Sequence, residues 1–234
     1  MSTQVVVALE TALEALAADP ETRVALLRGA GERGFTGGAD IAEFPALLEK
    51  RADAGREGIQ RLADKIEDFP KPIIVAIHGF CMGGGLEIAL ACDIRIAALD
   101  ARIGLPEIRL GLLPGGGGTQ RLPRSVGPGR ARLMIFTGEP ISGRRAYEWG
   151  LVEDVVEATE LFGKAGALAR TLAAQSPHAL AVVKALARET RDAALGDGLR
   201  TERAAFSRCL AHPDGREGVA AFLEKREPHW SATQ

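Results

Sequence analysis

The strongest constraint on the fold is a run of β-branched residues that leads through glycines into a helix. Residues 73–77 read Ile-Ile-Val-Ala-Ile, which is typical of a buried strand. Residues 79–85 include Gly79 and the triplet Gly83-Gly84-Gly85, so they predict a loop. Residues 86–92 are apolar again and predict a helix directly behind that triplet. A strand, a glycine loop and a helix in this order favour an α/β fold.

Similar patterns on both sides extend this unit into a core. Apolar residues recur at helical spacing from Val6 to Leu16, so the chain opens with an amphipathic helix. The same spacing from Ile59 to Phe69 predicts a second helix, which prolines end. Residues 29–41 are rich in glycine and are expected to hold no regular structure. The other expected strands cover residues 24–27, 94–97, 101–104 and 152–156.

The last third of the chain has a helical pattern. Helices are expected over residues 161–172, 177–188, 199–210 and 216–225. A chain of 234 residues with 46% hydrophobic content is large enough to bury one core. We therefore expect an α/β core over residues 1–157 and a helical C-terminal lobe over residues 158–234.

Composition excludes several classes of function. The formal net charge of −2 gives no electrostatic reason to expect a nucleic acid or an anionic membrane as partner. No apolar stretch is long enough to cross a bilayer. Cys81, Cys92 and Cys209 are far apart and form no CxxC pair, which favours a reducing compartment over a disulfide framework. We expect a cytoplasmic protein.

Two motifs fail when their structural context is considered. Gly29, Gly31 and Gly34 spell GxGxxG after an expected strand. A dinucleotide-binding turn also needs a helix that begins there and faces the pyrophosphate, but residues 35–38 show no helical periodicity. The four histidines include no pair at metal-ligand spacing, so no metal site is expected. His78, at the end of a strand, is expected to be satisfied by backbone hydrogen bonds.

Two glutamates lie beside glycine runs in apolar sequence. Glu87 falls in the first turn of the helix behind Gly85, where backbone amides are unpaired and favour negative charge. Glu107 lies between an expected strand and the second glycine run, residues 115–118. Alone, each has an ordinary explanation, as a first-turn acid or a loop carboxylate. Together they match what a general acid/base pair needs.

Three segments carry a resemblance to a known family. They are Phe35-Thr-Gly-Gly-Ala-Asp-Ile41, Met82-Gly-Gly-Gly-Leu-Glu87, and Leu105-Pro-Glu107 followed by Pro114-Gly-Gly-Gly-Gly-Thr-Gln-Arg-Leu122. In this order, and with twenty positions between the glutamates, the chain resembles the enoyl-CoA hydratase/isomerase family, the crotonase superfamily. The resemblance runs from about Ser2 to Trp230 and includes the closing segment 217–226.

The resemblance implies a fold and an activity. The fold would be a crotonase-like α/β spiral of strand–strand–helix turns with a helical trimerisation lobe, assembled as a homotrimer or a dimer of trimers. The activity would be reversible addition of water to a 2,3-enoyl-CoA, giving a 3-hydroxyacyl-CoA. Two backbone amides would stabilise the thioester oxygen, and Glu87 and Glu107 would hold the water and transfer protons. No metal or redox cofactor is expected, because the thioester already lowers the barrier to addition. Coenzyme A is part of the acyl-CoA substrate.

The resemblance also assigns residues outside the glutamate pair. The two oxyanion donors match the amides of Ala39 and Gly84, and Gly115 matches a glycine that lines the water and carboxylate site. Leu86 and Leu105, beside the carboxylates, are expected to shape an apolar acyl pocket. The remaining expected contacts with coenzyme A come from Ala39, Asp40, Ile41 and Ala42 on the adenine side, and from Phe222 and Lys225, which would reach the coenzyme A of a neighbouring subunit.

The chain departs from the family pattern at its beginning. Members usually have a pair of strands before the first helix, whereas this chain begins near that helix. We therefore expect those strands, and backbone that touches coenzyme A, to be missing. Three alternatives stay open: an enoyl-CoA isomerase, which would need only one base; another acyl-CoA lyase of the superfamily; and a catalytically silent oligomeric homologue.

Overall fold

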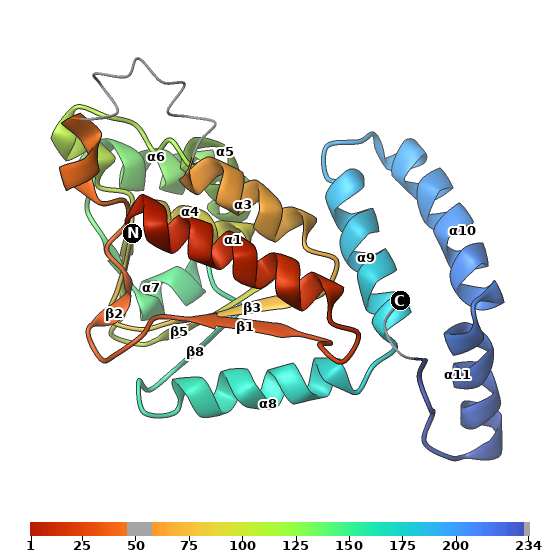
Figure 1. Cartoon of the computed structure of the whole chain (residues 1–234). Coiled ribbons are helices and arrows are strands. Elements are labelled where there is room, and N and C mark those ends of the chain that lie inside the picture. The colour runs from red at the N-terminus through yellow and green to blue at the C-terminus, as the bar shows by residue number, and fades with distance from the viewer. Residues whose placement is uncertain (46–57, 232–234) are drawn as a thin grey trace.

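The computed structural model describes residues 1–45 and 58–231 (Figure 1). Its strands form two four-stranded sheets. The first sheet is parallel and contains, in spatial order, β1 (Ala25–Arg28), β3 (Ile73–Ile77), β5 (Ile94–Ala98) and β8 (Asp154–Val156). The second contains β2 (Gly34–Thr36), β4 (Phe80–Met82), β6 (Arg102–Gly104) and β7 (Ile141–Ser142), of which β7 alone runs antiparallel to its neighbour.

Strands β1 to β6 alternate between the two sheets, and a helix follows each of these three pairs. Strands β1 and β2 precede α3 (Ile59–Asp68), and β3 and β4 precede α4 (Gly84–Ala91). Strands β5 and β6 precede a 3₁₀ helix, η2 (Glu107–Leu110), and then α5 (Gly118–Val126). This repeated strand–strand–helix turn confirms the α/β spiral expected from the sequence.

Burial explains why these segments have their sequences. All five residues of β3 are buried, because β3 is an inner strand with β1 and β5 on either side, hence its uninterrupted apolar run. All eight residues of α4 are buried as well, so this helix has no polar face and no helical periodicity. In contrast, α3 buries one stripe, which includes Leu62 and Ile66, and keeps charged residues outside.

Two segments expected as loops contain short strands. Residues 29–41 hold β2, and residues 79–85 hold β4. Each has only three residues and is stabilised by its parallel neighbours in the second sheet, β2 on β4 and β4 on β6. Such pairing depends on tertiary contacts and leaves little local signal. The expected strands on either side of Asp100 also lie in different sheets and do not pair with each other.

Helices surround the sheets and form the C-terminal part of the molecule. Figure 1 shows α9 (Pro177–Glu189), α10 (Leu195–Ala211) and α11 (Pro213–Glu224) standing beside the core. In contrast, α8 (Leu161–Ala173) lies along the first sheet and buries Leu161 and Ala165 in the core. The division into a core and a C-terminal lobe near residue 157 stays a prediction. The last three residues of the predicted lobe, 232–234, lie outside the described part of the chain. The other helices within residues 1–45 and 58–231 are α1 (Thr3–Ala18), η1 (Ile41–Glu43), α6 (Pro128–Thr137) and α7 (Gly143–Glu148).

Candidate active site

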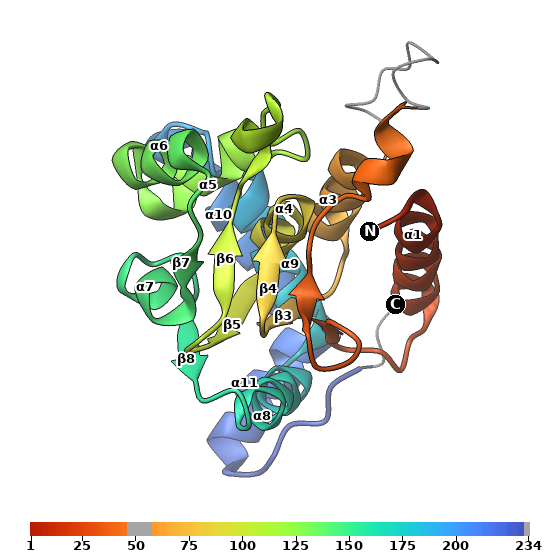
Figure 2. The same ribbon diagram turned by 90° about the vertical axis from the view of Figure 1, so that its left-hand side faces the viewer.

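The three sequence segments meet at one edge of the second sheet. Strands β2, β4 and β6 are parallel neighbours (Figure 2), so their carboxyl ends lie together. Met82 at the end of β4 pairs with Gly104 at the end of β6. Glu87 follows Met82 in the chain, and Glu107 follows Gly104. The sheet therefore brings both glutamates to one place.

Glu87 is held by backbone amides of the second glycine run. Its side chain is buried, with the residue 2% exposed. The N–H groups of Gly116 and Gly118 donate hydrogen bonds to Glu87 Oε1 at 2.7 and 2.8 Å. Burial raises the pKa of Glu87, while these two amides and the positive charge of Arg121 oppose that rise. The contacts thus orient the carboxylate and favour its ionised form.

Glu107, unlike Glu87, has a carboxyl oxygen without a hydrogen-bond donor among the described residues. It is the first residue of η2, directly behind Pro106. Its Oε1 lies close to Gly83, where an added Cβ would come within 2.8 Å of it. Its Oε2 is buried and has no hydrogen-bond partner among the described residues. Burial raises the pKa of Glu107 from 4.5 to about 7, and repulsion from Glu87 adds to the rise. This carboxyl is suited to carry a proton near neutral pH.

The expected oxyanion donors lie on two segments that touch. Gly84 is the first residue of α4 and is buried. Gly38 packs against it with a left-handed φ of 97°, and an added Cβ there would lie 2.8 Å from Met82 O and 3.3 Å from Gly84 N. The loop that carries Ala39 therefore lies beside the N-terminus of α4. Neither the Ala39 nor the Gly84 amide donates a hydrogen bond within the part of the chain that the structure describes.

The other predicted site residues occupy varied surroundings. Asp40 accepts a hydrogen bond from Ala42 N and begins η1, whose Ile41 is exposed. Leu86 and Leu105 are fully buried in the core. The predicted role of Gly115 in lining the water and carboxylate site stays a prediction, and the amides of its neighbours Gly116 and Gly118 contact Glu87. Phe222 and Lys225 lie at the end of α11, which stands apart from the glutamate edge within one chain (Figure 1).

The sequence interpretation did not identify two side chains beside the glutamates. Ile59, the first residue of α3, lies over the glycines: an added Cβ would come within 2.3 Å of its Cδ1 at Gly84 and within 2.7 Å of its Cγ2 at Gly116. Arg121 of α5 donates a hydrogen bond to Gly116 O at 3.0 Å. Ile59 left no signal beyond its helical pattern. Arg121 does have a sequence signal, because it lies one helical turn after Gly117 and so on the side of the helix next to the glycine run.

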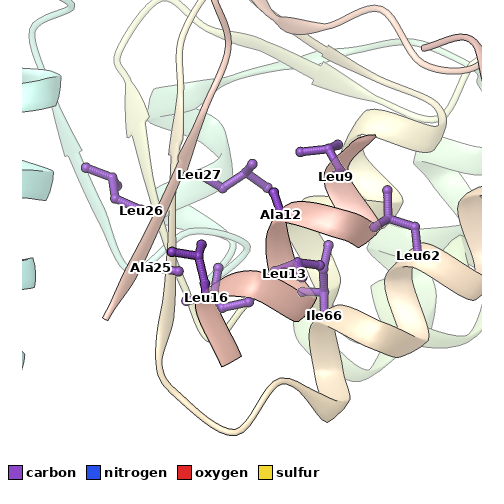
Figure 3. A pocket seen from close by; sticks show the side chains of 10 residues that line it. Leu9, Ala12, Leu13, Leu16, Ala25, Leu26, Leu27, Leu62 and Ile66 are labelled. Carbon is purple, nitrogen blue, oxygen red and sulfur yellow. The ribbon is translucent and has the colours of Figure 1, made fainter. Parts of the chain in front are cut away.

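Elsewhere the molecule has an apolar pocket that is unsuited to catalysis. A cavity of about 170 Å³ lies between α1, α3 and the strands β1 and β3 (Figure 3). Its ten lining residues are all aliphatic, and none has a group that could transfer a proton. Within the described residues, no cluster of His, Cys, Asp and Glu could hold a metal ion, and no helix is long and apolar enough to cross a bilayer.

Comparisons with known proteins agree with this geometry. The model of a family described as enoyl-CoA hydratase/isomerase matches residues 1–233. The chain is 43% identical to a probable enoyl-CoA hydratase of Bacillus subtilis over 98% of this chain and 90% of that protein. It is 39% identical to a crotonyl-CoA hydratase of Syntrophomonas wolfei over 95% and 85% of the two chains. A crystal structure of enoyl-CoA hydratase from Bacillus anthracis matches with a TM-score of 0.93 at 40% identity, over 98% and 89% of the two chains.

Proposed function

The chain belongs to the enoyl-CoA hydratase/isomerase family, and from this premise we propose that Glu87 and Glu107 add water reversibly to a 2,3-enoyl-CoA. The activity is that of an enoyl-CoA hydratase, a hydro-lyase, and its product is a 3-hydroxyacyl-CoA. One observation carries the assignment of residues. Two carboxyls with unequal hydrogen bonding, Glu87 buried and Glu107 half-buried, lie at the edge where the Ala39 loop meets the N-terminus of α4.

The amides of Ala39 and Gly84 would stabilise the charge that develops during addition. When water attacks the β carbon of the conjugated alkene, electron density moves to the thioester oxygen. Two donors already fixed by the backbone would bind that oxygen more strongly as it becomes negative. Loss of one such donor typically lowers the rate by about 10²–10³. The N-terminal end of α4 adds favourable partial charge at the same point.

The two glutamates would divide the proton transfers. Two amides donate to Glu87 and oppose the rise that burial causes in its pKa, so Glu87 would act as the base that removes a proton from the attacking water. Burial raises the pKa of Glu107 to about 7, so this carboxyl would carry a proton near neutral pH and donate it to the α carbon. The C–O bond thus forms at the β carbon, the alkene π electrons form the C–H bond at the α carbon, and one proton remains on the pair. Each such role is worth about 10²–10⁴ in rate.

We propose that this chemistry uses no metal or redox cofactor, because the thioester itself activates the alkene. Coenzyme A would enter as part of the substrate, with its adenine end against the segment Ala39–Ala42, in which Ala39 is half-buried and the other three residues are exposed. An isomerase needs one shuttling base, so two carboxyls with different proton occupancy favour hydration over isomerisation.

We further propose a homotrimer or a dimer of trimers that assembles through the C-terminal helices. Large apolar side chains on α10 and α11 are exposed in the single chain, which is unfavourable unless a partner covers them. Phe222 and Lys225 would then reach a neighbouring subunit's site. The exposed side chains on these helices include Leu195, Leu199, Phe206, Leu210, Phe222 and Leu223.

Substitution of each glutamate tests the assignment. Glu87→Gln and Glu107→Gln should each lower the rate of crotonyl-CoA hydration by about 10²-fold or more, because each removes one proton transfer. The assay follows loss of the conjugated absorbance, and thioester affinity is measured separately and should stay near the wild-type value. Glu139→Gln, at an exposed residue paired with Arg109, is the control and should stay within about twofold. Nearly full activity in either site variant would refute the two-carboxylate mechanism.

A further inference from the structure

Arg121 is a nearly buried cation behind the catalytic loop, and the reaction described above gives it no role. Its side chain is 11% exposed. One nitrogen, Nη1, donates to Gly116 O at 3.0 Å. The other, Nη2, donates to Asp64 Oδ1 at 2.9 Å and to Glu67 Oε2 at 2.7 Å, both on α3. The guanidinium therefore joins α3 to the glycine loop.

The glycine run makes room for this guanidinium. Gly117 has a φ of 104°, and an added Cβ there would lie 2.1 Å from Arg121 Nη1. Gly117 O also accepts the backbone N–H of Arg121 at 2.8 Å, as the first turn of α5 begins. A side chain at position 117 would therefore block the path by which Nη1 reaches Gly116 O. This contact gives a physical reason for a glycine at 117 and an arginine four residues later.

A single residue links Arg121 to Glu87. The carbonyl of Gly116 accepts from Arg121, and the N–H of the same residue donates to Glu87 Oε1. Gly118, two residues on, donates to that same oxygen. Any shift of the loop would therefore alter the position of the carboxylate. We propose that Arg121 is a positioning residue for hydration: it fixes the loop 116–118 so that two amides hold the Glu87 carboxylate in its reactive orientation.

The surrounding charges agree with this role. Glu87 is faced by Glu107 from η2 and by Arg121 from α5, so the arginine charge opposes the like-charge repulsion. Arg121 is in turn neutralised by the two α3 carboxylates, and Glu67 also pairs with Arg191 at 3.0 Å. A lysine would supply the charge but could not bind the carbonyl and two carboxylates with one planar fork.

The inference rests on the proposed function, and it is tested with Arg121→Gln and Arg121→Lys in the full-length protein. We expect kcat for crotonyl-CoA hydration to fall by roughly 10–100-fold, because small displacements of a catalytic group have effects of this size. KM should change much less, since Arg121 is expected to make no substrate contact. In Arg121→Gln the acid limb of the pH–rate profile should move to higher pH, because Glu87 loses a nearby positive charge and well-placed donors.

Arg124→Gln is the matched control. Arg124 lies on the same helix and pairs with Asp192 at 3.3 Å, but its side chain is 46% exposed and its contacts are away from the glycine loop. Its kcat and pH profile should match those of the wild type. A wild-type kcat in Arg121→Lys would refute the positioning role, because charge alone would then suffice. Equal loss in the Arg121 and Arg124 variants would also refute it, by indicating general destabilisation of α5.

A second measurement separates this inference from the proposed function. The Glu87 carboxyl is titrated in ligand-free protein by NMR with ¹³C-labelled glutamate, and Glu87→Gln identifies its signal. A higher Glu87 pKa in Arg121→Gln supports the inference even if the wild type fails to hydrate crotonyl-CoA, a failure that would overturn only the proposed function. An unchanged Glu87 titration in Arg121→Gln overturns the inference, whatever the activity.

Discussion

Gly116→Ala tests whether the glycine loop holds Glu87. The added methyl carbon would lie 2.5 Å from Glu87 Oε2 and 2.7 Å from Ile59 Cγ2. Unstrained contacts between such atoms lie near 3.5 Å or beyond, so the carboxylate, the loop or both must move by roughly 1 Å. Gly116 is not one of the described glycines with a positive φ, so alanine fits its backbone conformation. The substitution therefore adds bulk there without backbone strain. The substitution therefore displaces Glu87 while keeping its charge.

The size of the effect follows from the hydrogen bonds at risk. The amides of Gly116 and Gly118 each donate to a charged oxygen, and such bonds contribute about 1.5–3 kcal/mol. Losing one of them in the transition state lowers kcat by roughly 10–100-fold, because about 1.4 kcal/mol corresponds to a factor of ten.

The assay is crotonyl-CoA hydration, with circular dichroism and a thermal melt to establish that the variant is folded. Gly129→Ala is the control, since an added Cβ at that helical position meets no atom within 4 Å. A folded Gly116→Ala protein with kcat within about threefold of the wild type would refute the view that this loop orients Glu87.

Two further predictions concern stability and assembly. Glu107→Gln should raise the free energy of unfolding by about 1–2 kcal/mol at pH 8 and by almost nothing near pH 4. The value at pH 8 is reduced to allow for partial exposure of the carboxyl. Its folded-state pKa of about 7 lies above the unfolded value, so stability contributed by this carboxyl falls as pH rises through that window. Urea unfolding at both pH values measures the difference, and equal effects at the two pH values would contradict it. Light scattering should give three or six times the chain mass for the wild type and a lower mass for Phe206→Glu, which places a charge on exposed α10. Val5→Glu, at an exposed residue of α1, is the control and should keep the wild-type mass. A monomeric wild type would exclude the proposed assembly.

Local patterns predicted the elements that are long or continuously buried. Residues 73–77 form β3 because an inner strand of a parallel sheet requires apolar residues on both faces. The helix behind Gly85 was predicted from its apolar run, although it begins at Gly84. The GxGxxG at residues 29–34 was correctly set aside, since β2 rather than a helix begins at Gly34.

Features that depend on distant contacts could not be predicted in the same way. Strands β2 and β4 exist only because parallel neighbours pair with them, and this pairing places the three catalytic segments at one edge. The donation of hydrogen bonds from Gly116 and Gly118 to Glu87 depends on the path of the loop past that side chain. The bridge from Arg121 to Asp64 joins residues 57 positions apart, a separation at which no sequence periodicity is informative.

The glycines explain why two chemically identical side chains should take different roles. Glu87 and Glu107 are both removed from bulk water, so burial alone would raise both pKa values. Their difference arises from donors: two amides and a nearby guanidinium favour the anion of Glu87, whereas Glu107 Oε2 has no partner among the described residues. In the proposed mechanism, a proton shared by the pair would therefore reside on Glu107. Those amides reach Glu87 only because positions 116 and 118 lack side chains, since an added Cβ at either would lie within 3.0 Å of its carboxylate. In the proposed mechanism, the second glycine run thus determines which glutamate is the base and which is the acid.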